Sequence, residues 1–272
     1  MLARSLALTL VSLLIAGCSA APTRTAVTPP VDLPRVSVMT YNLNFGIAGD
    51  QDTIGVVSHE NADVVFFQEA NDAWAASLKR RLSAAYPYAE FKADDIYAAG
   101  LGVMSKWPIE SIEYLPKVNW FPAARVVIAT PIGRLQVLNL HLRPPVSKSG
   151  SVIAGHFTTP PIREAEVQEF TKALDPSLPT LIVGDFNENE YGRASTWLTS
   201  QGYRSALPEF NPKAYTWRWK TSVMTLKGSY DRLCYDRRLV PLDTNVRNAG
   251  WSDHLPVVGV FALAGNISPS PR

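Results

Sequence analysis

The sequence is poor in cysteine and nearly balanced in charge. Two cysteines in 272 residues, Cys18 and Cys234, are too few for a disulfide framework or a cysteine-rich zinc site. Lys and Arg number 26 against 24 Asp and Glu, which gives a formal net charge of +2. This charge is too small to indicate binding to nucleic acid, and no acidic tail indicates a basic partner. The composition excludes a zinc finger, a coiled coil and a polytopic membrane protein. The 46% of apolar residues predicts a globular protein with a large core.

The N-terminus is typical of a secretory leader. Residues 1–17 carry one basic residue, Arg4, followed by an apolar run from Leu6 to Ala16. This run is too short to span a bilayer comfortably. Residues 1–17 are therefore predicted to be a signal peptide and are excluded from the fold.

The end of the leader, Ile15–Cys18, resembles the lipobox of bacterial lipoproteins. In that class the leader is cut before the cysteine, whose thiol then carries a diacylglycerol. The resemblance implies lipidation of Cys18 and a membrane anchor in the bacterial cell envelope. Ser19 in place of Asp favours the outer membrane or periplasm over the inner membrane. A plain signal peptide with an incidental cysteine is the alternative.

The rest of the chain divides into three segments. Residues 18–34 are small, polar and rich in proline, which predicts an extended tether. Residues 265–272 are predicted to be a frayed tail. Residues 35–264 are compatible with one globular domain.

Short apolar runs within this domain predict strands, and segments between them predict helices. Strands outnumber helices and come in hairpin pairs, which predicts helices plus two mixed sheets packed face to face. Many of the runs are continuous, which is typical of strands buried on both faces. The predicted strands are Arg35–Tyr41, Asp63–Phe67, Leu101–Ser105, Arg125–Ile128, Leu135–Leu142, Thr180–Gly184, Tyr230–Tyr235 and Pro256–Ala262. The predicted helices are Asp52–Asn61, Asn71–Ala84, Pro161–Leu174 and Arg193–Gln201. A segment without periodicity, Arg143–Pro160, begins two residues after His141 and predicts a long loop that is either functional or disordered.

Polar side chains recur at the ends of these strands. Neighbouring strands lie about 4.8 Å apart, so such groups converge if the strands share a sheet. A single polar residue after an apolar strand predicts only a loop or a helix cap. Six strand ends that carry polar residues in one order form a pattern specific enough to identify a site. The polar residues are Asn42, Asn44, Glu69, His141, Asp185, Asn187, Asp231, Asp253 and His254.

The ordered set resembles the endonuclease/exonuclease/phosphatase superfamily, which includes relatives of DNase I, exonuclease III, sphingomyelinases and inositol polyphosphate 5-phosphatases. The resemblance runs from Arg35 to Ala262. Its motifs are GDFN at 184–187, SDH at 252–254, Thr-Trp at 216–217 and GVMS at 102–105 followed by WPI at 107–109. It implies a four-layer α/β sandwich of the DNase I type, with two central mixed sheets flanked by helices and a site at one end of the sheets.

The resemblance also implies a metal site. Glu69 is expected to be the principal metal ligand, with Asn42 and Asp253 close to the same ion. Oxygen ligands with few imidazoles suit a hard cation, Mg²⁺ first and Mn²⁺ or Ca²⁺ next. A helix cap is the alternative role for Glu69.

The expected reaction is in-line attack of water on phosphorus. His254 resembles the general base of the family, and Asp231 fixes its tautomer and stabilises the imidazolium. Asp185 and Asn187 resemble the pair that orients nucleophile and phosphate, and His141 resembles the donor to a non-bridging phosphoryl oxygen.

Further residues are weaker candidates. Arg125, Arg143 and Asn44 can contact the substrate phosphate, and a surface ion pair is the alternative for Arg125. Trp217 and Trp219 alternate with basic residues, which predicts either a strip for stacking bases or ordinary hairpin packing.

The sequence thus predicts a metal-dependent phosphoester hydrolase, as a monomer, with the substrate class open. A nuclease or phosphodiesterase is favoured by the compact size, whereas the low net charge disfavours it. An esterase of phospholipid, sphingolipid or inositol or sugar phosphates is favoured by the membrane anchor. A non-catalytic phosphate-binding relative is the remaining alternative, and the filled catalytic positions argue against it.

Overall fold

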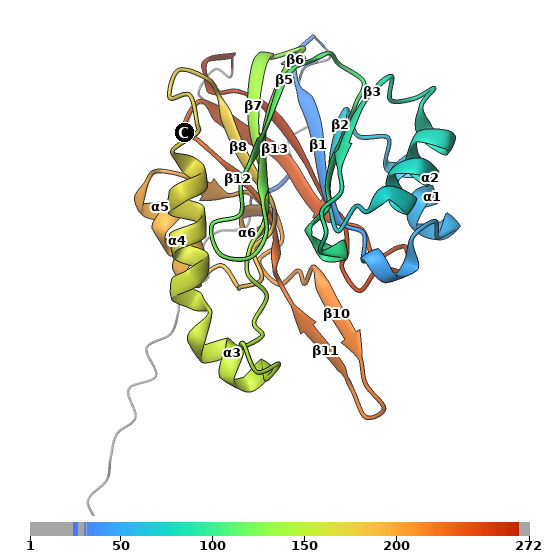
Figure 1. Cartoon of the computed structure of the whole chain (residues 1–272). Helices are drawn as coiled ribbons and strands as arrows, with labels where there is room; N and C mark the ends of the chain where they lie inside the picture. The colour runs from blue at the N-terminus through green and yellow to red at the C-terminus, as the bar shows by residue number, and fades with distance from the viewer. Residues whose placement is uncertain (1–23, 27–29, 31, 267–272) are drawn as a thin grey trace, which may run out of the picture.

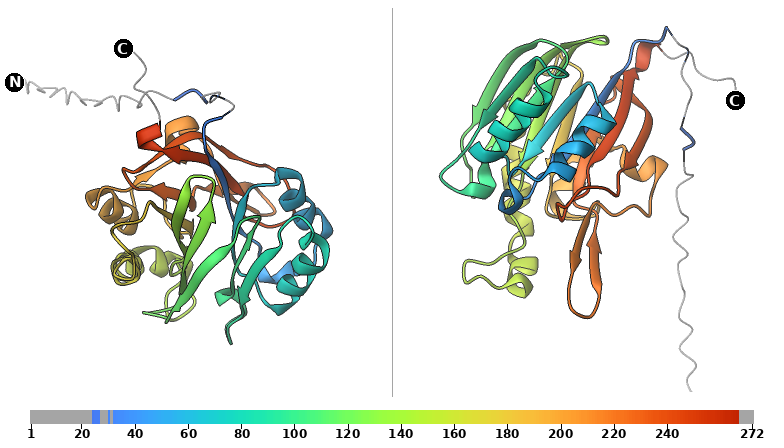
Figure 2. Two further views of the ribbon diagram at one scale, coloured as in Figure 1. Left: turned by 90° about the horizontal axis from the view of Figure 1, so that it is seen from above. Right: turned by 90° about the vertical axis from the view of Figure 1, so that its right-hand side faces the viewer.

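The computed structural model describes residues 24–26, 30 and 32–266, which form two packed β-sheets with helices on both outer faces (Figures 1 and 2). The predicted leader and the predicted lipidation site, Cys18, lie outside the described residues. Sheet A consists, in spatial order, of β13 (Leu239–Val246), β14 (Val257–Leu263), β1 (Val36–Asn42), β2 (Val64–Gln68), β4 (Leu101–Ser105) and β3 (Tyr88–Lys92).

Sheet B, like sheet A, contains six strands and one parallel pair of neighbouring strands. It consists, in spatial order, of β5 (Ile109–Leu115), β6 (Ala123–Thr130), β7 (Gly133–His141), β8 (Thr180–Asp185), β12 (Asp231–Tyr235) and β9 (Arg204–Ser205). The pairs β1–β2 and β7–β8 are parallel and the other pairs are antiparallel, so both sheets are mixed. A separate hairpin is formed by β10 (Trp217–Lys220) and β11 (Thr225–Gly228).

Helices complete the layers. The α-helices are α1 (Gln51–Glu60), α2 (Asp72–Leu82), α3 (Val152–Thr158), α4 (Pro160–Thr171), α5 (Arg193–Ser200) and α6 (Leu207–Phe210), and 3-10 turns are η1 (Phe45–Ile47), η2 (Tyr97–Ala99) and η3 (Ala264–Asn266). Helices α1 and α2 cover the outer face of sheet A, and α4 and α5 cover that of sheet B (Figure 2). The expected four-layer sandwich is confirmed.

Three apolar clusters hold the layers together. The central cluster lies between the sheets, where Val38 and Phe66 of sheet A pack in the same cluster as Val126 and Val183 of sheet B. The other two clusters lie under the helices on either side. All five residues of β2 are buried, because one face meets the central core and the other meets α1 and α2. This double burial explains the continuous apolar runs in the sequence.

The structure differs from the prediction in the long loop and in several strands. The segment Arg143–Pro160 contains α3, and α4 begins at Pro160, whose proline suits a first helical turn. The strands β3, β5, β9, β10, β11 and β13 were not predicted. In β3 the side chains alternate between exposed and half-buried, so the strand has no apolar run. In β13 the register shifts between Pro241 and Asp243, so a bulge directly follows the proline.

Among the residues that the structure describes, no helix combines the length and apolar character needed to cross a bilayer. Arg24, within the predicted tether, contacts the domain. Its guanidinium is ion-paired with Glu209 of α6 at 2.8 Å and lies over the ring of Phe210.

Candidate active site

Three polar residues stand side by side at one end of sheet B. His141 ends β7, Asp185 ends β8 and Asp231 begins β12. The strand register pairs His141 with Asp185 and Asp185 with Asp231. All three side chains are buried. Strand register alone therefore brings together groups that are up to 90 residues apart in the sequence.

Gly184 allows β8 to approach β7 closely just before Asp185. Its φ is +127°, and a Cβ there would lie 2.0 Å from the carbonyl oxygen of Leu140. Only glycine fits this backbone position. The glycine of the GDFN motif therefore has a structural role, which is to let the Asp185 carboxylate reach the strand end beside His141.

Sheet A contributes Asn42 and Glu69 to the same end of the sandwich. Asn42 ends β1, and its Nδ2 donates to Glu69 Oε1 and to Asp185 Oδ2, both at 3.1 Å. Glu69 follows β2 with a positive φ of 58°, and its Oε2 accepts from the backbone N–H of Phe45 at 3.0 Å. The fully buried Asn42 amide thus joins the two sheets at the site.

His254 lies between two carboxylates. Its Nδ1 is 2.9 and 3.1 Å from the two oxygens of Asp231, and its Nε2 is 3.5 Å from Asp185 Oδ2. Because a carboxylate only accepts, Nδ1 carries hydrogen. The backbone of His254 is also held in place, because its N–H donates to Ser252 Oγ at 3.1 Å. On the other side, Thr216 Oγ1 accepts from the backbone N–H of Asp231 at 2.9 Å.

His141 is held by a carbonyl and an aromatic ring. Its Nδ1 lies 3.1 Å from the carbonyl oxygen of Ala98 and its Nε2 lies 3.6 Å from Asp185 Oδ2. The imidazole is stacked on Phe121, with ring centroids 4.2 Å apart. Since the Ala98 carbonyl can only accept, Nδ1 is the protonated nitrogen of the neutral ring. Nε2 then donates a hydrogen bond only when both nitrogens are protonated.

Asn187 occupies a strained turn after β8. Its φ is +52°, its backbone N–H donates to Asp185 Oδ1 at 2.8 Å, and its Nδ2 donates to the carbonyl oxygen of Leu142 at 3.0 Å. Behind this turn, the buried Arg163 of α4 pairs with Glu188 at 3.0 Å and donates to the carbonyl oxygen of Arg143 at 3.1 Å. Helix α4 therefore ties the turn to the segment that follows His141.

Asp253 and Asn44 form the outer part of the site. Asn44 Nδ2 donates to Asp253 Oδ1 at 2.9 Å, and Trp217 Nε1 donates to Asp253 Oδ2 at 2.9 Å. Both side chains are half-buried. Asn44 is thus oriented towards a predicted metal ligand, and the base of the β10–β11 hairpin is bonded directly to the site.

Two sets of residues offer ligand atoms for a cation. In the described part of the chain, Asp185, Asp231 and His254 each supply one such atom within 4.8 Å of the others. However, a hydrogen-bonded proton already lies between His254 Nδ1 and Asp231 Oδ2, and a metal would have to displace it. The oxygen atoms of Glu69, Asn42 and Asp253 form the other set, and their oxygen chemistry suits a hard divalent ion.

Burial governs the protonation of this site. Burial raises the pKa of Glu69 and of Asp185, and it lowers the pKa of His141. Burial also opposes the charged form of His254, but the carboxylates of Asp231 and Asp185 outweigh it and raise its pKa to about 10. The neighbourhood therefore stabilises an imidazolium at His254.

Two predicted phosphate contacts are engaged elsewhere. Arg125 Nε donates to Gln136 Oε1 at 2.6 Å, and its Nη1 lies 3.6 Å from Glu113, so the alternative of an ion pair is the observed one. Arg143 is buried, lies over the ring of Trp120 at 3.4 Å and donates to the carbonyl oxygen of Val146. These contacts give Arg143 a packing role behind His141.

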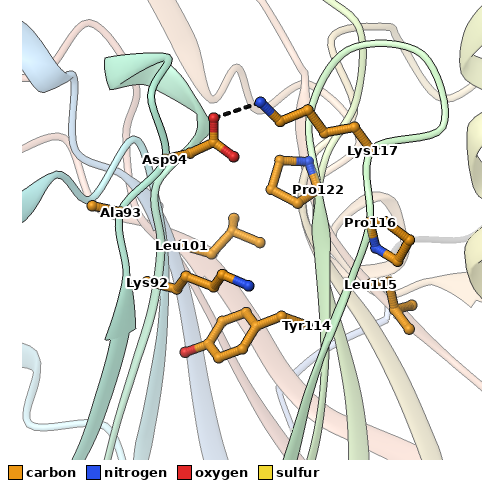
Figure 3. A pocket seen from close by; sticks show the side chains of 9 residues that line it. All are labelled: Lys92, Ala93, Asp94, Leu101, Tyr114, Leu115, Pro116, Lys117 and Pro122. Carbon is orange, nitrogen blue, oxygen red and sulfur yellow. Dashed lines mark hydrogen bonds and ion pairs between the residues drawn. The ribbon is translucent and has the colours of Figure 1, made fainter.

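The hollow beside the site lies against the hairpin. It has a volume of about 700 Å³ and includes Asn44, Arg218, Trp219, Trp251 and Asp253 in its lining. A second hollow of about 450 Å³, drawn in Figure 3, lies between β3 and β5 and is crossed by the Asp94–Lys117 ion pair. None of the predicted catalytic residues lines the second hollow.

Sequence reasoning missed the residues that support the site. Phe121 beneath His141 and the Arg163–Glu188 pair lie outside the motifs. Thr216 beneath Asp231 belongs to the Thr-Trp motif, but the sequence assigns it no role. A polar residue within or next to a motif, such as Ser252 in SDH and Glu188 after GDFN, is the one available signal for such roles.

Comparisons with known proteins agree with this geometry. Residues 39–254 match the model of the Endonuclease/Exonuclease/phosphatase family. A comparison with curated protein sequences gave no significant match.

Solved structures show the same fold at low sequence identity. An endonuclease/exonuclease/phosphatase protein from Beutenbergia cavernae has a TM-score of 0.68 at 19% identity, over 85% of this chain and 72% of that chain. TDP2 of D. rerio, solved with a single-strand DNA product, has a TM-score of 0.67 at 16% identity, over 84% and 98%. ANGEL2, a 2',3'-cyclic phosphatase solved with adenosine-2',3'-vanadate, has a TM-score of 0.61 at 15% identity, over 86% and 97%. With a family match that spans most of the domain, the chain belongs to the endonuclease/exonuclease/phosphatase family of phosphoester hydrolases.

Proposed function

We propose that the protein is a divalent-metal-dependent phosphodiester hydrolase in which His254 activates the attacking water. The observation that carries this proposal is the buried Asp231–His254 hydrogen bond, with His254 Nε2 directed at Asp185 beside the hollow. A carboxylate behind an imidazole is the arrangement that general-base catalysis requires. Asp231 fixes the tautomer and stabilises the imidazolium that forms when Nε2 takes a proton from water. Since the pKa of His254 is about 10, the neutral ring that acts as the base is the minor form at neutral pH.

Asp185 and Asn187 are proposed to orient the nucleophile and the phosphoryl group. The Asn187 backbone already holds Asp185 Oδ1, which leaves Oδ2 directed towards both histidines. His141 donates from Nε2 to a non-bridging phosphoryl oxygen, a role that needs the imidazolium, which burial disfavours and a bound anionic phosphate would favour. Preorganised hydrogen-bond donors in a buried site contribute a large part of the rate enhancement. Loss of one such donor lowers the rate by a factor of about 10²–10³.

Glu69, Asn42 and Asp253 are proposed to hold the cation, with Mg²⁺ preferred and Mn²⁺ or Ca²⁺ next. The donor set supports this choice, since it consists of oxygen atoms and burial disfavours an uncompensated charge on Glu69. A bound cation would neutralise charge on the phosphoryl oxygens. The chain's own residues perform the proton transfer and the alignment.

Nucleic acid is the substrate that we propose first. Structural relatives with this fold were solved with a single-strand DNA product and with an adenosine vanadate. The hollow beside Asp253 also combines Trp219 and Trp251 with Arg218, which suits bases and phosphates. A phospholipid or inositol phosphate is the second candidate, favoured by the apolar side chains that the chain exposes near the site.

Two variants test the catalytic proposal. Asp185→Ala and His254→Ala are expected to abolish hydrolysis of bis-p-nitrophenyl phosphate while leaving the circular dichroism spectrum unchanged. His156→Ala, on α3, serves as the matched histidine control and keeps activity. EDTA is expected to stop the reaction and Mg²⁺ or Mn²⁺ to restore it. Full activity in either catalytic variant, or in chelator, refutes the proposal.

A substrate panel separates the candidates. The purified protein is assayed against plasmid DNA, RNA, phospholipid and inositol phosphates under one set of conditions. Cleavage of DNA or RNA supports the nuclease proposal. Turnover of lipid without nicking of plasmid overturns it in favour of the second candidate.

We also propose that Cys18 carries a lipid that holds the protein at the cell envelope, at the outer membrane or in the periplasm. The lipobox-like segment Ile15–Cys18 supports this proposal. Cys18→Ser is expected to release the protein from the membrane fraction. Unchanged membrane retention in the variant contradicts the anchor.

A further inference from the structure

Two arms extend from the sandwich and carry exposed apolar side chains. The α3 arm, residues 143–158, exposes Val152, Ile153 and Phe157 to 61%, 78% and 76%. The hairpin arm, residues 217–228, exposes Val223 and Met224 at its turn to 87% and 60%. Soluble monomers rarely expose apolar clusters of this kind unless the cluster has a binding role.

Both arms begin at the candidate active site. The α3 arm starts two residues after His141, and the hairpin arm starts at Trp217, which donates to Asp253. In two views the arms extend from the same end of the sandwich and lie beside each other (Figures 1 and 2). Any surface that contacts both arm tips therefore also faces the end of the sandwich that holds the site.

The arms carry charge of one sign. Neither arm contains Asp or Glu, whereas the hairpin arm contains Arg218, Lys220 and Lys227 and the α3 arm contains Lys148. Arg143, at the base of the α3 arm, is buried and does not add to this charge. The whole chain is almost neutral, with a net charge of +2, so this positive charge is local. Apolar tips combined with basic residues are the pattern that binds the interface of an anionic bilayer.

We propose that the two arms dock onto an anionic phospholipid bilayer, with the side chains of Ile153, Phe157, Val223 and Met224 inserted among the lipids. Nucleic acid fits the tips less well, because single strands bind through stacking on aromatic rings and three of these four side chains are aliphatic. The bilayer complements both the apolar tips and the basic charge. Docking brings the candidate active site to the level of the lipid head groups.

The test measures insertion at single positions, independently of hydrolysis and of any lipid anchor. The full chain carries Cys18→Ser, and the remaining Cys234 is buried. Met224→Cys or Ile153→Cys is then labelled with the environment-sensitive dye NBD. Vesicles of phosphatidylglycerol and phosphatidylethanolamine are expected to shift the emission of both labels to the blue. The control is Tyr88→Cys, at an exposed position where β3 pairs with Ser105, at the opposite end of sheet A.

Every outcome of this experiment decides the proposal. A blue shift at both arms and none at position 88 supports docking. Absence of a shift, a shift at one arm alone, or an equal shift at all three positions overturns it. A shift produced by single-stranded DNA and not by vesicles overturns it as well and assigns the arms to nucleic acid.

Charge reversal provides a second, independent measurement. Lys220→Glu combined with Lys227→Glu is expected to weaken partitioning into the anionic vesicles about tenfold or more, because each cation near such a surface adds to binding. Lys172→Glu, exposed just beyond the end of α4, is the matched control and is expected to leave partitioning unchanged. Equal partitioning of the double variant and the control contradicts the charge argument. Since partitioning needs no turnover, docking can fail while the proposed hydrolysis stands, and the reverse also holds.

Discussion

At the scale of single residues, the chemistry of this site depends on pairs rather than on isolated groups. His254 has a carboxylate at each ring nitrogen, and only Asp231 is within hydrogen-bond distance. A carboxylate so placed selects one tautomer, whereas an amide in its place also offers N–H donors. Replacing Asp231 with asparagine therefore removes the charge of the side chain while keeping its shape.

Asp231→Asn tests this separation. The variant is nearly isosteric, so folding is expected to persist, while kcat falls by about 10²–10⁴ because the amide can favour the wrong tautomer of His254. The measurement is steady-state kinetics beside a thermal unfolding curve. Asp95→Asn, at an exposed position, is the control. An unchanged kcat in Asp231→Asn would remove the pair from the mechanism.

A second residue-scale prediction concerns Glu166 of α4. Its carboxylate accepts from the backbone N–H of Arg143 at 2.9 Å, and burial raises its pKa to about 7. Below about pH 4 the Glu166 carboxyl is protonated in both the folded and the unfolded chain. As pH rises to 7, this carboxyl ionises first in the unfolded chain. The folded state therefore loses stability between pH 4 and 7 and keeps that penalty above pH 7.

Glu166→Gln is expected to remove this penalty. The variant should be more stable than the wild type by about 1–3 kcal/mol at pH 8, and the difference should close below pH 4. Urea unfolding at several pH values measures it, with the exposed Glu169→Gln as control. A stability difference that does not change with pH contradicts the assignment.

The sequence predicted that polar groups at the ends of apolar strands converge, while the catalytic and metal roles assigned to them stay predictions. Asn42, Asp185, Asp231 and His254 followed this pattern, and their side chains meet. Arg125 did not follow it, because it lies inside β6 and its side chain is held by Gln136. The supporting contacts, such as Phe121 under His141, depend on which segments pack together, which no local pattern encodes.

At the scale of elements, β7 and β8 approach closely at Gly184, next to the site. Gly184→Ala is expected to lower the free energy of unfolding by about 2–4 kcal/mol, since the methyl group would meet the carbonyl of Leu140 and φ is positive. Urea unfolding provides the measurement. Gly55→Ala, in an open position of α1, is expected to stabilise by about 0.5–1 kcal/mol. Equal effects of the two substitutions would contradict the steric argument.

Elements were predictable where burial imposes a pattern on the sequence. The eight predicted strands contain continuous apolar runs, and each matches an observed strand to within two residues at either end. Strand β3 lies at an edge of sheet A and leaves alternate side chains exposed, so its sequence lacks that pattern. Helix α3 exposes its apolar residues, which removes the amphipathic periodicity that identifies a buried helix.

At the scale of the whole molecule, the site exists only while the two sheets are packed together. Asn42 of sheet A donates to Asp185 of sheet B, and His254, which precedes β14 of sheet A, bonds to Asp231 of sheet B. The pattern of strands and helices predicted two mixed sheets packed face to face with helices, and the family resemblance implied the four-layer sandwich, whereas composition alone predicted only a globular domain. A ligand that binds this end of the sandwich also stabilises the packing of the two sheets.

Mg²⁺ is therefore expected to raise Tm. At a concentration of 100 times its Kd, a ligand specific for the folded state adds about 2.7 kcal/mol, which corresponds to about 5 °C or more for a domain of this size. Differential scanning fluorimetry measures the shift, with NaCl at equal ionic strength as control. Glu69→Gln should abolish it. A wild-type Tm insensitive to Mg²⁺, Mn²⁺ and Ca²⁺ would contradict the cation site.

The contact of Arg24 with α6 limits how far the domain can move from an anchored N-terminus. Arg24 lies six positions after Cys18, so the chain between their Cα atoms spans at most about 20 Å. While the Arg24–Glu209 ion pair holds, an acyl chain on Cys18 would keep α6 within that distance of the membrane surface. Release of Arg24 would add the residues between it and β1 to the free chain, so with a lipid on Cys18 the contact of Arg24 with Glu209 would set the effective length of the chain between membrane and domain.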